Sequence, residues 1–304
     1  MLRMESVNRM SAAGGAVAQL NLHAPEGSIY ALVGAADSGK STVLALVCGL
    51  LTPDSGRIVI NGLSMSLRAN RRRRHQLVGY MPAKNAADPN LKLIEYLEFY
   101  AHIYGKYGLS ARENCMELLR MTGLDRRSDS LMSTLPGSIL REAEFLRCLI
   151  HRPKLLLADE PFSGMDARER AVTEEIMRQL AAEGVTIVLT STSLADSAML
   201  CDSLGLMDQG KMMDEGSRED VLERLRADAP IYFEVADDPE KAVRFLSGDE
   251  AVQAFSWQGK RFKLQFLGDA AAQAELLGKM VSAGISVSSF RRGDGTPGGL
   301  FGGI

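Results

Sequence analysis

Residues Gly34–Thr42 read G-A-A-D-S-G-K-S-T, which has the form G-x-x-x-x-G-K-[ST]. The motif follows an apolar run, Ile29–Val33, that predicts a β-strand. Its glycines let the backbone curl so that its N–H groups point at phosphate oxygens. Lys40 would supply a cation for the β- and γ-phosphates, and Ser41 a hydroxyl ligand for Mg²⁺. The stretch therefore predicts a nucleoside triphosphate site at the start of a helix over Lys40–Leu51.

A second motif lies at the end of another apolar strand. Lys154–Pro161 read K-L-L-L-A-D-E-P, so two carboxylates, Asp159 and Glu160, follow each other. Neighbouring residues on a strand point to opposite faces, and the two side chains therefore cannot share one role. We expect Asp159 to hold Mg²⁺, usually through a water molecule, and Glu160 to act as the general base that polarises the attacking water.

Further segments, in the same order, resemble the nucleotide-binding subunit of ATP-binding cassette (ABC) transporters over residues 1–225. Leu51–Gly62 is similar to the hairpin that follows the P-loop helix, and Leu200–Gly216 to the last strand and turn of the ATPase core. Asp159–Asp166 (D-E-P-F-S-G-M-D) resembles the Walker B segment and the D-loop. The resemblance implies a P-loop α/β domain over residues 1–227 and places Asp166 at the interface between two subunits.

The segment that opens the signature helix departs from the family's L-S-G-G-Q. Leu135–Ile139 read L-P-G-S-I. Pro136 removes a serine hydroxyl and a backbone N–H, although proline is tolerated in the first helical turn. The resemblance implies that Gly137 and Ser138 reach a nucleotide held by the partner subunit. Ser138 could restore a hydroxyl donor one position along.

Three other positions lack the residue that is usual in the family. Ala83 replaces the Q-loop glutamine that contacts the metal, and Thr192 replaces the switch histidine that contacts the γ-phosphate. Where the family stacks adenine on an aromatic ring, this chain has Met10 or Ser11. Such a stack is worth about 1 kcal/mol, so we expect weakened nucleotide binding.

The predicted site thus has one catalytic residue, Glu160, and two Mg²⁺ ligands, Ser41 and Asp159. Within its P-loop, Asp37 places a negative charge where glycine is usual. The expected nucleotide contacts are Gly34, Ala35, Ala36, Asp37, Ser38, Gly39, Lys40, Ser41, Thr42, Gly137, Ser138, Asp159, Asp166 and Thr192.

The middle and the end of the chain predict two further structural parts. A helical subdomain is expected at about residues 88–150, where Leu91–Tyr104 carries apolar and aromatic side chains at helical spacing. From residue 228 the pattern βαββαβ predicts a ferredoxin-like α+β domain over residues 228–292, for regulation or dimer contact. A glycine-rich tail over residues 293–304 follows. The strands and helices of this domain are expected at 231–235, 239–246, 251–257, 261–266, 270–283 and 285–290.

Composition narrows the classes of function. Among 304 residues, no apolar run approaches the roughly 18 residues that span a bilayer. The net charge of −3 gives no basis for nucleic-acid binding, and we expect none. The run Arg71–Arg74 is interpreted as a solvated loop, with a patch for anionic headgroups or nucleic acid as the alternative. The four cysteines, widely spaced, are expected to be buried reduced thiols.

The leading hypothesis is an ATP-binding and ATP-hydrolysing subunit of an ABC exporter. It would be cytoplasmic, held at the inner face of the cell membrane by a membrane-spanning subunit, and would form a homodimer or a heterodimer with a second ABC ATPase. The membrane subunit is expected to contact the loop Ala83–Asn90. The first alternative is a pseudo-ATPase that binds ATP as a structural or regulatory ligand beside an intact partner. The second, favoured only by Arg71–Arg74, is an ABC protein that acts on ribosomes or DNA.

Overall fold

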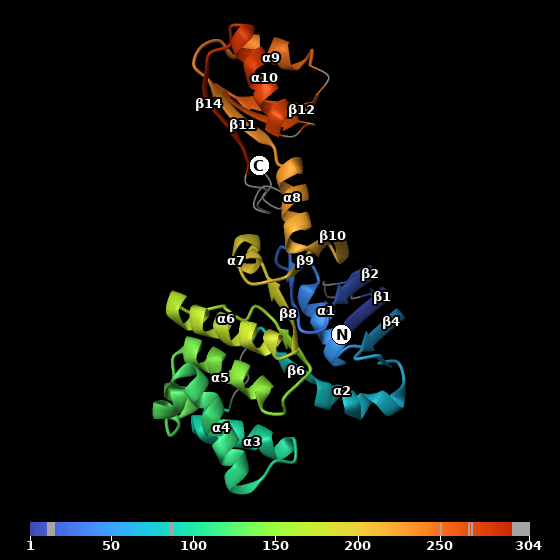
Figure 1. The fold of residues 1–304 in the computed structure, drawn as a ribbon, viewed down its shortest axis with the longest axis vertical. Coiled ribbons are helices and arrows are strands. Elements are labelled where there is room, and N and C mark those ends of the chain that lie inside the picture. Colours follow the sequence, from blue (N-terminus) through green and yellow to red (C-terminus); the bar gives the residue numbers. More distant parts are fainter. Residues whose placement is uncertain (11–15, 85–87, 250, 267, 269, 294–304) are drawn as a thin grey trace. The chain divides into compact units, whose positions relative to one another are not determined.

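The computed structural model describes residues 1–10, 16–84, 88–249, 251–266, 268 and 270–293. The chain separates into two compact units, Met1–Ser217 and Arg218–Ile304, which are coloured from blue to red in Figure 1. The division falls before helix α8 (Arg218–Asp228), whereas the sequence interpretation placed it after that helix. Apart from Gly293, the glycine-rich tail lies outside the described residues.

The first unit is built on a six-stranded sheet with the order β10-β9-β3-β8-β7-β6. Neighbours from β9 to β6 are parallel, and β10 pairs antiparallel with β9. All residues of β3 and β7 are buried, as is typical of a parallel sheet covered on both faces. The strands are β3 (Ile29–Val33), β6 (Val78–Met81), β7 (Leu155–Ala158), β8 (Thr186–Ser191), β9 (Ser203–Asp208) and β10 (Lys211–Ser217).

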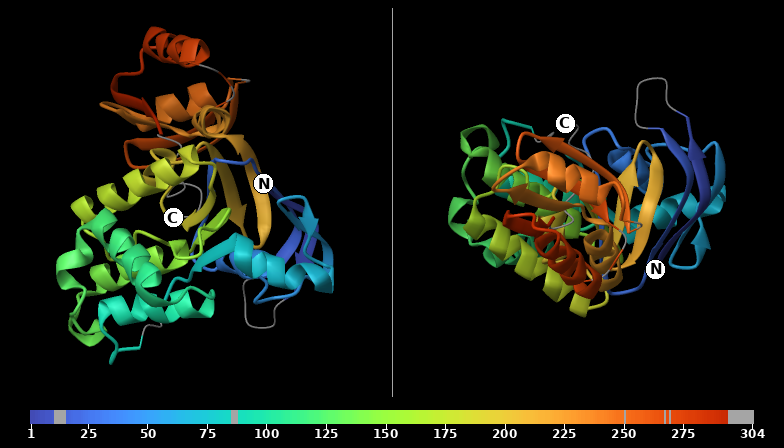
Figure 2. Two further views of the ribbon diagram at one scale, coloured as in Figure 1. Left: turned by 60° about the horizontal axis from the view of Figure 1, so that its bottom comes forward. Right: turned by 90° about the horizontal axis from the view of Figure 1, so that it is seen from above.

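A second, antiparallel sheet has the order β2-β1-β4-β5. Its inward side chains, such as Met4, Leu22 and Ile60, form one apolar core with α1 and β3. The hairpin expected over Leu51–Gly62 contains β4, while its partner β5 begins one residue later; β1 and β2 were not predicted. Both views of Figure 2 show these blue strands and the green helices on opposite sides of the central strands. The four strands are β1 (Leu2–Arg9), β2 (Val17–Ala24), β4 (Ser55–Ile60) and β5 (Leu63–Ser64).

Two local predictions for this unit differ from the structure. Helix α1 (Lys40–Cys48) is shorter than expected, because Gly49 ends it in the left-handed conformation with φ 85°. The predicted loop at Arg71–Arg74 is wrong, since these arginines open helix α2 (Arg71–Leu77). Arginine and glutamine have high helix propensity, which explains why a charged run here is helical.

The range of about 88–150, for which the sequence predicts a helical subdomain, is mainly helical. Its first helix, α3, buries Leu93, Ile94 and Leu97 on one face, and at its start the backbone N–H of Lys92 donates to the Glu95 carboxylate at 2.9 Å. Short 3₁₀ turns join the later helices of the subdomain. The helices of this part and those that follow it are α3 (Leu93–Ile103), α4 (Gly108–Thr122), α5 (Gly137–Leu149), α6 (Ala167–Ala182) and α7 (Leu194–Ala198).

The second unit has its own sheet, with the order β12-β13-β11-β14 and antiparallel neighbours throughout. Its separate core contains Phe233, Leu264 and Phe262, the ring of which stacks on Phe233 at 4.7 Å. The predicted order βαββαβ is present after α8, while the ferredoxin-like assignment stays a prediction. The elements are β11 (Ile231–Val235), α9 (Pro239–Leu246), β12 (Val252–Gln258), β13 (Arg261–Phe266), α10 (Ala270–Ser282) and β14 (Val287–Arg292).

In the part of the chain that the structure describes, none of the helices combines the length and the apolar character that crossing a membrane requires.

Candidate nucleotide site

The sheet brings the separate motifs of the sequence to one edge. Val33, the last residue of β3, is level with Ser191 of β8, and Ala158 of β7 is level with Leu189. The P-loop, the two carboxylates and Thr192 each follow one of these parallel strands. Ligand sites of parallel α/β sheets lie at this carboxyl edge.

The backbone of the P-loop fits an anion. A side chain at Gly34 would collide with the carbonyl oxygen of Met207 and with Ser38 Oγ, so only glycine suits this close approach. Gly39, with φ 100°, leads into α1, whose first-turn N–H groups have no intrahelical acceptor. Asp37 also has a left-handed φ of 62°, which aspartate tolerates better than most residues. Oriented N–H groups beside a helix N-terminus are a binding site for phosphate.

Lys40 carries the positive charge of this loop. Its Nζ donates hydrogen bonds to the carbonyl oxygens of Gly34 at 2.8 Å and Ala35 at 2.7 Å. Burial lowers the pKa of Lys40, and the nearby carboxylates of Glu160, Asp159 and Asp37 partly offset that effect. The structure therefore brings both halves of the predicted site, the lysine and the two adjacent carboxylates, within electrostatic reach of one another.

Asp159 is buried at the end of β7 and is held by a residue that the sequence analysis missed. Thr190 Oγ1 donates to Asp159 Oδ1 at 2.6 Å and accepts a hydrogen bond from the backbone N–H of Glu160 at 2.9 Å. The available signal was a threonine directly after the apolar run Ile187–Leu189 of β8, near the end of that strand. Carboxylate and hydroxyl oxygens, as in Asp159 and Ser41, are ligands that suit Mg²⁺.

Glu160 has a strained backbone and a perturbed carboxyl group. Its φ is 46°, in the left-handed region that is uncommon for a residue with a side chain. Burial raises the pKa of Glu160, whereas the Lys40 ammonium and a hydrogen bond from the backbone N–H of Thr192 lower it. Thr192 thus contacts the predicted base, Glu160, through its backbone N–H. Comparing the threonine side chain with the histidine that is usual in the family does not reveal this contact.

Arg141 was also missed, and it contacts the backbone around both carboxylates. Its guanidinium donates to the carbonyl oxygens of Pro82 and Asp159, each at 2.5 Å, and of Glu160 at 3.0 Å. It also pairs with Glu144 at 3.2 Å. Charged residues are rarely buried without partners. The available signal in the sequence was therefore the single arginine among the acidic residues of the run R-E-A-E, which follows the signature position.

The signature and D-loop residues lie together at the starts of two helices. Gly137 and Ser138 open α5, and Asp166 is the N-cap of α6, accepting hydrogen bonds from two first-turn N–H groups. Ser138 Oγ donates to Glu169 at 2.8 Å. The hydroxyl of Ser138 is therefore engaged by its own chain. Contact of Gly137, Ser138 and Asp166 with a nucleotide on a second subunit stays a prediction.

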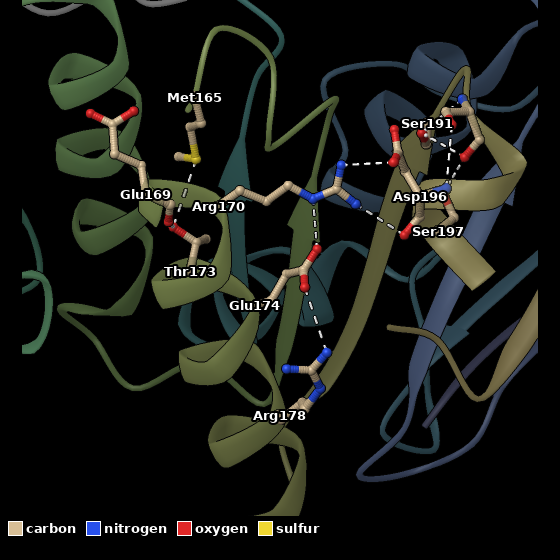
Figure 3. A network of polar contacts seen from close by, with 10 residues as sticks. Met165, Glu169, Arg170, Thr173, Glu174, Arg178, Ser191, Asp196 and Ser197 are labelled. Atoms are coloured by element: carbon tan, nitrogen blue, oxygen red, sulfur yellow. Dashed lines mark hydrogen bonds and ion pairs between the residues drawn. The ribbon is translucent and has the colours of Figure 1, made fainter. Parts of the chain in front are cut away.

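A polar network joins the D-loop helix to the segment after β8 (Figure 3). Arg170 of α6 forms ion pairs with Glu174 at 2.7 Å and with Asp196 of α7 at 2.9 Å. Ser193 caps α7 by accepting from the N–H of Asp196. The network fixes the position of the segment that contains Thr192.

The remaining departures from the family's pattern lie at the surface. Ala83 and Thr192 are exposed. Met10 is 83% exposed, and Ser11 lies outside the described residues.

Three of the four cysteines are buried and Cys48 is half-buried, all as free thiols.

Known proteins resemble this chain in sequence and in fold. Residues 17–163 match the family model described as ABC transporter. Nod factor export ATP-binding protein I of Cupriavidus metallidurans is 31% identical over 191 residues, 63% of this chain and 62% of that protein. Linearmycin resistance ATP-binding protein LnrL of Bacillus subtilis is 30% identical over 250 residues, 81% of this chain and 80% of that protein.

Solved structures agree with these sequence matches. An ATP-binding subunit of an ABC transporter superposes with a TM-score of 0.67 at 25% identity, covering 74% of this chain and 92% of that chain. A dimeric bacterial ABC transporter cassette gives a TM-score of 0.66 at 21% identity, covering 72% and 99%. The fold and the site define an ATP-binding cassette of the P-loop class. This chain belongs to the ABC transporter family of ATP-binding subunits. It spans less than two thirds of the length of the Nod factor relative.

Proposed function

We propose that this chain hydrolyses ATP as the nucleotide-binding subunit of an ABC exporter. The observation that supports this most is that Lys40, Asp159 and Glu160 lie at one edge of the sheet, close enough for the two carboxylates to raise the pKa of Lys40. This edge therefore combines a phosphate-binding cation with the carboxylates that hydrolysis needs. Relatives named for Nod factor export and linearmycin resistance support export as the direction of transport. The pseudo-ATPase alternative gains no support from these names.

The chemistry requires few groups from the protein. Lys40 and the N–H groups of the P-loop hold the phosphates, and Glu160 accepts a proton from the attacking water. Ser41 and Asp159 would hold Mg²⁺, which supplies charge neutralisation at the phosphate oxygens. The raised pKa of Glu160 suits a general base, since proton transfer is most effective when the base's pKa lies near the working pH.

The proposed assembly has two cassettes and a membrane-spanning subunit. A groove of about 310 Å³ between α2, β6 and α3 is lined in part by Tyr80, Tyr100 and Tyr104. Aromatic side chains are enriched in protein interfaces. We place the membrane subunit at this groove and at the adjoining loop Ala83–Asn90, of which residues 85–87 lie outside the described chain. Such a partner would hold the chain at the inner face of the cell membrane.

Steady-state hydrolysis of Mg-ATP by the purified chain at high concentration tests the proposal. We expect turnover that Glu160→Gln abolishes, while the affinity for ATP stays within about twofold. Lys40→Ala should abolish tight binding, because the phosphates lose their cation. ATP binding without turnover in the parent chain would instead favour the pseudo-ATPase, and unchanged affinity in the Lys40 variant would contradict the assignment of the site.

A further inference from the structure

We propose that Arg141 is a positioning residue for hydrolysis, which fixes the backbone that carries Glu160 and ties it to the signature helix. The proposal rests on the function proposed above, in which Glu160 is the general base. Arg141 does not contact the substrate in this scheme. It acts through the main chain of Asp159 and Glu160.

The guanidinium of Arg141 joins three segments that are distant in sequence. Nη1 donates to the carbonyl oxygen of Pro82 at 2.5 Å, and Nη2 donates to those of Asp159 at 2.5 Å and Glu160 at 3.0 Å. Arg141 itself lies one helical turn after Ser138 on α5. The ends of β6 and β7 and the start of the signature helix are therefore fixed relative to one another by a single side chain.

Burial makes this arrangement rigid. Arg141 is 5% exposed, and its charge is paired with Glu144, which is 2% exposed. A buried cation with several charge-assisted hydrogen bonds has few alternative positions, because each alternative would leave a desolvated group without a partner. The planar fork of arginine serves several carbonyls at once, which the compact ammonium of lysine cannot reproduce.

Glu160 needs such support because its backbone is strained. A residue with a side chain and a φ of 46° persists only where its surroundings determine its conformation. Its N–H is bonded to Thr190 Oγ1, and its carbonyl oxygen accepts from Arg141 and from the N–H of Ser163. Arg141 is the member of this set that also reaches the signature helix.

The contact with Pro82 gives the arrangement a second consequence. Pro82 precedes Ala83, whose methyl group cannot make the contacts of the family's glutamine. The hydrogen bond from Arg141 connects this segment, where we place the membrane subunit, with the backbone of Glu160. A displacement of Pro82 would therefore be transmitted to the backbone of Glu160 by the hydrogen bonds of Arg141, and not by the side chain of residue 83.

The test measures turnover and nucleotide affinity separately in the full-length chain. For Arg141→Lys we expect kcat for ATP hydrolysis to fall at least tenfold, while the dissociation constant for ATP stays within twofold. Arg147→Lys is the matched control, since Arg147 lies on the same helix and donates to a carbonyl of β6, that of Tyr80, at 2.9 Å. In the described part of the chain, Arg147 makes no hydrogen bond to the backbone of Glu160, and the kcat of Arg147→Lys should stay within twofold of the parent.

Two results would overturn the proposal: a kcat for Arg141→Lys within twofold of the parent, or an equal loss in kcat and ATP affinity. If the lysine variant does not fold, Glu144→Gln decides, because it keeps Arg141 but removes its ion pair. We expect this variant to lose kcat by threefold or more at unchanged affinity, and an unchanged kcat would contradict the proposal. Parent turnover that survives Glu160→Gln would instead refute the proposed function, so the two failures are distinguishable.

Discussion

Asp37 places a carboxylate inside the loop that must receive phosphate. It also has a left-handed φ of 62°, which glycine adopts at lower cost. We expect Asp37→Gly to tighten ATP binding several-fold, because it removes both a like-charge repulsion and a source of strain. Titration calorimetry with ATP would measure this. Asp129→Asn, on the helical subdomain, is the control for a general effect of charge, and an unchanged or weaker affinity for Asp37→Gly would contradict the explanation.

Glu142 is a buried carboxyl group beside the signature position. It is 3% exposed, and its pKa is raised to about 7, first by burial and then by Glu169 and Asp166. The folded state therefore binds a proton that the unfolded state has released, so between about pH 4.5 and 7 stability falls as pH rises. Above pH 7 the whole cost is present.

Glu142→Gln should remove this pH-dependent cost. We expect the variant to gain roughly 1–2 kcal/mol over the parent at pH 8 and little at pH 5, because the neutral amide never carries the charge whose burial costs free energy. Urea unfolding of the first unit at both pH values would show the difference. An equal effect at the two pH values would mean that packing, and not ionisation, separates the variants.

Single residues were predictable where their type determines their chemistry. The P-loop, Asp159 and Glu160 lie together as their motifs indicated, because all follow parallel strands of one sheet. Thr190 and Arg141 were not found, since their roles depend on backbone carbonyls and N–H groups that the fold brings near them. Every residue has a backbone carbonyl group, so a hydrogen bond to the main chain does not depend on the type of the residue contacted. Such a contact therefore leaves no pattern in the sequence.

Helices α6 and α7 are joined by the Arg170 network shown in Figure 3. Arg170 pairs with Glu174 and Asp196, and its guanidinium lies 5.0 Å from the centre of the Phe162 ring. Asp196 is half exposed, so we expect Asp196→Asn to lower the free energy of unfolding by less than about 1 kcal/mol. Arg170→Met loses all three contacts and should cost about 1–2 kcal/mol.

Urea unfolding of both single variants and the double variant gives the coupling between Arg170 and Asp196. A value above about 1 kcal/mol would show that the pair is stronger than exposed ion pairs usually are. Ser193→Ala is a useful comparison, because it removes the N-cap of α7 and should cost about 1 kcal/mol without touching Arg170.

Elements were predictable where periodicity or a terminator was clear. The strands Ile231–Val235 and Arg261–Phe266 have the predicted bounds, because alternating apolar residues end at turn residues. The strand β1 was missed, since its bulged register with β2 interrupts the alternation. Helix α2 was missed because its charged run has no apolar periodicity, and its described residues are exposed or half-buried.

At the scale of the whole molecule, the two units have separate cores, and their stabilities should be separable. Phe262 is 2% exposed and packs among Phe233, Leu264 and their neighbours in the second unit. Phe262→Ala should destabilise that unit by about 3–5 kcal/mol, because it removes a buried ring and leaves a cavity. Differential scanning calorimetry should then show one transition at lower temperature and the other unchanged.

Adding ATP identifies which transition belongs to which unit. A ligand stabilises only the part that binds it, so ATP should raise the midpoint of the first unit's transition in both the parent and Phe262→Ala. Leu157→Ala, in the buried strand that leads to Asp159, is the reciprocal variant and should lower that transition instead. A single transition that shifts as a whole in each variant would show that the units unfold together, and the second unit would then contribute to the stability of the nucleotide site.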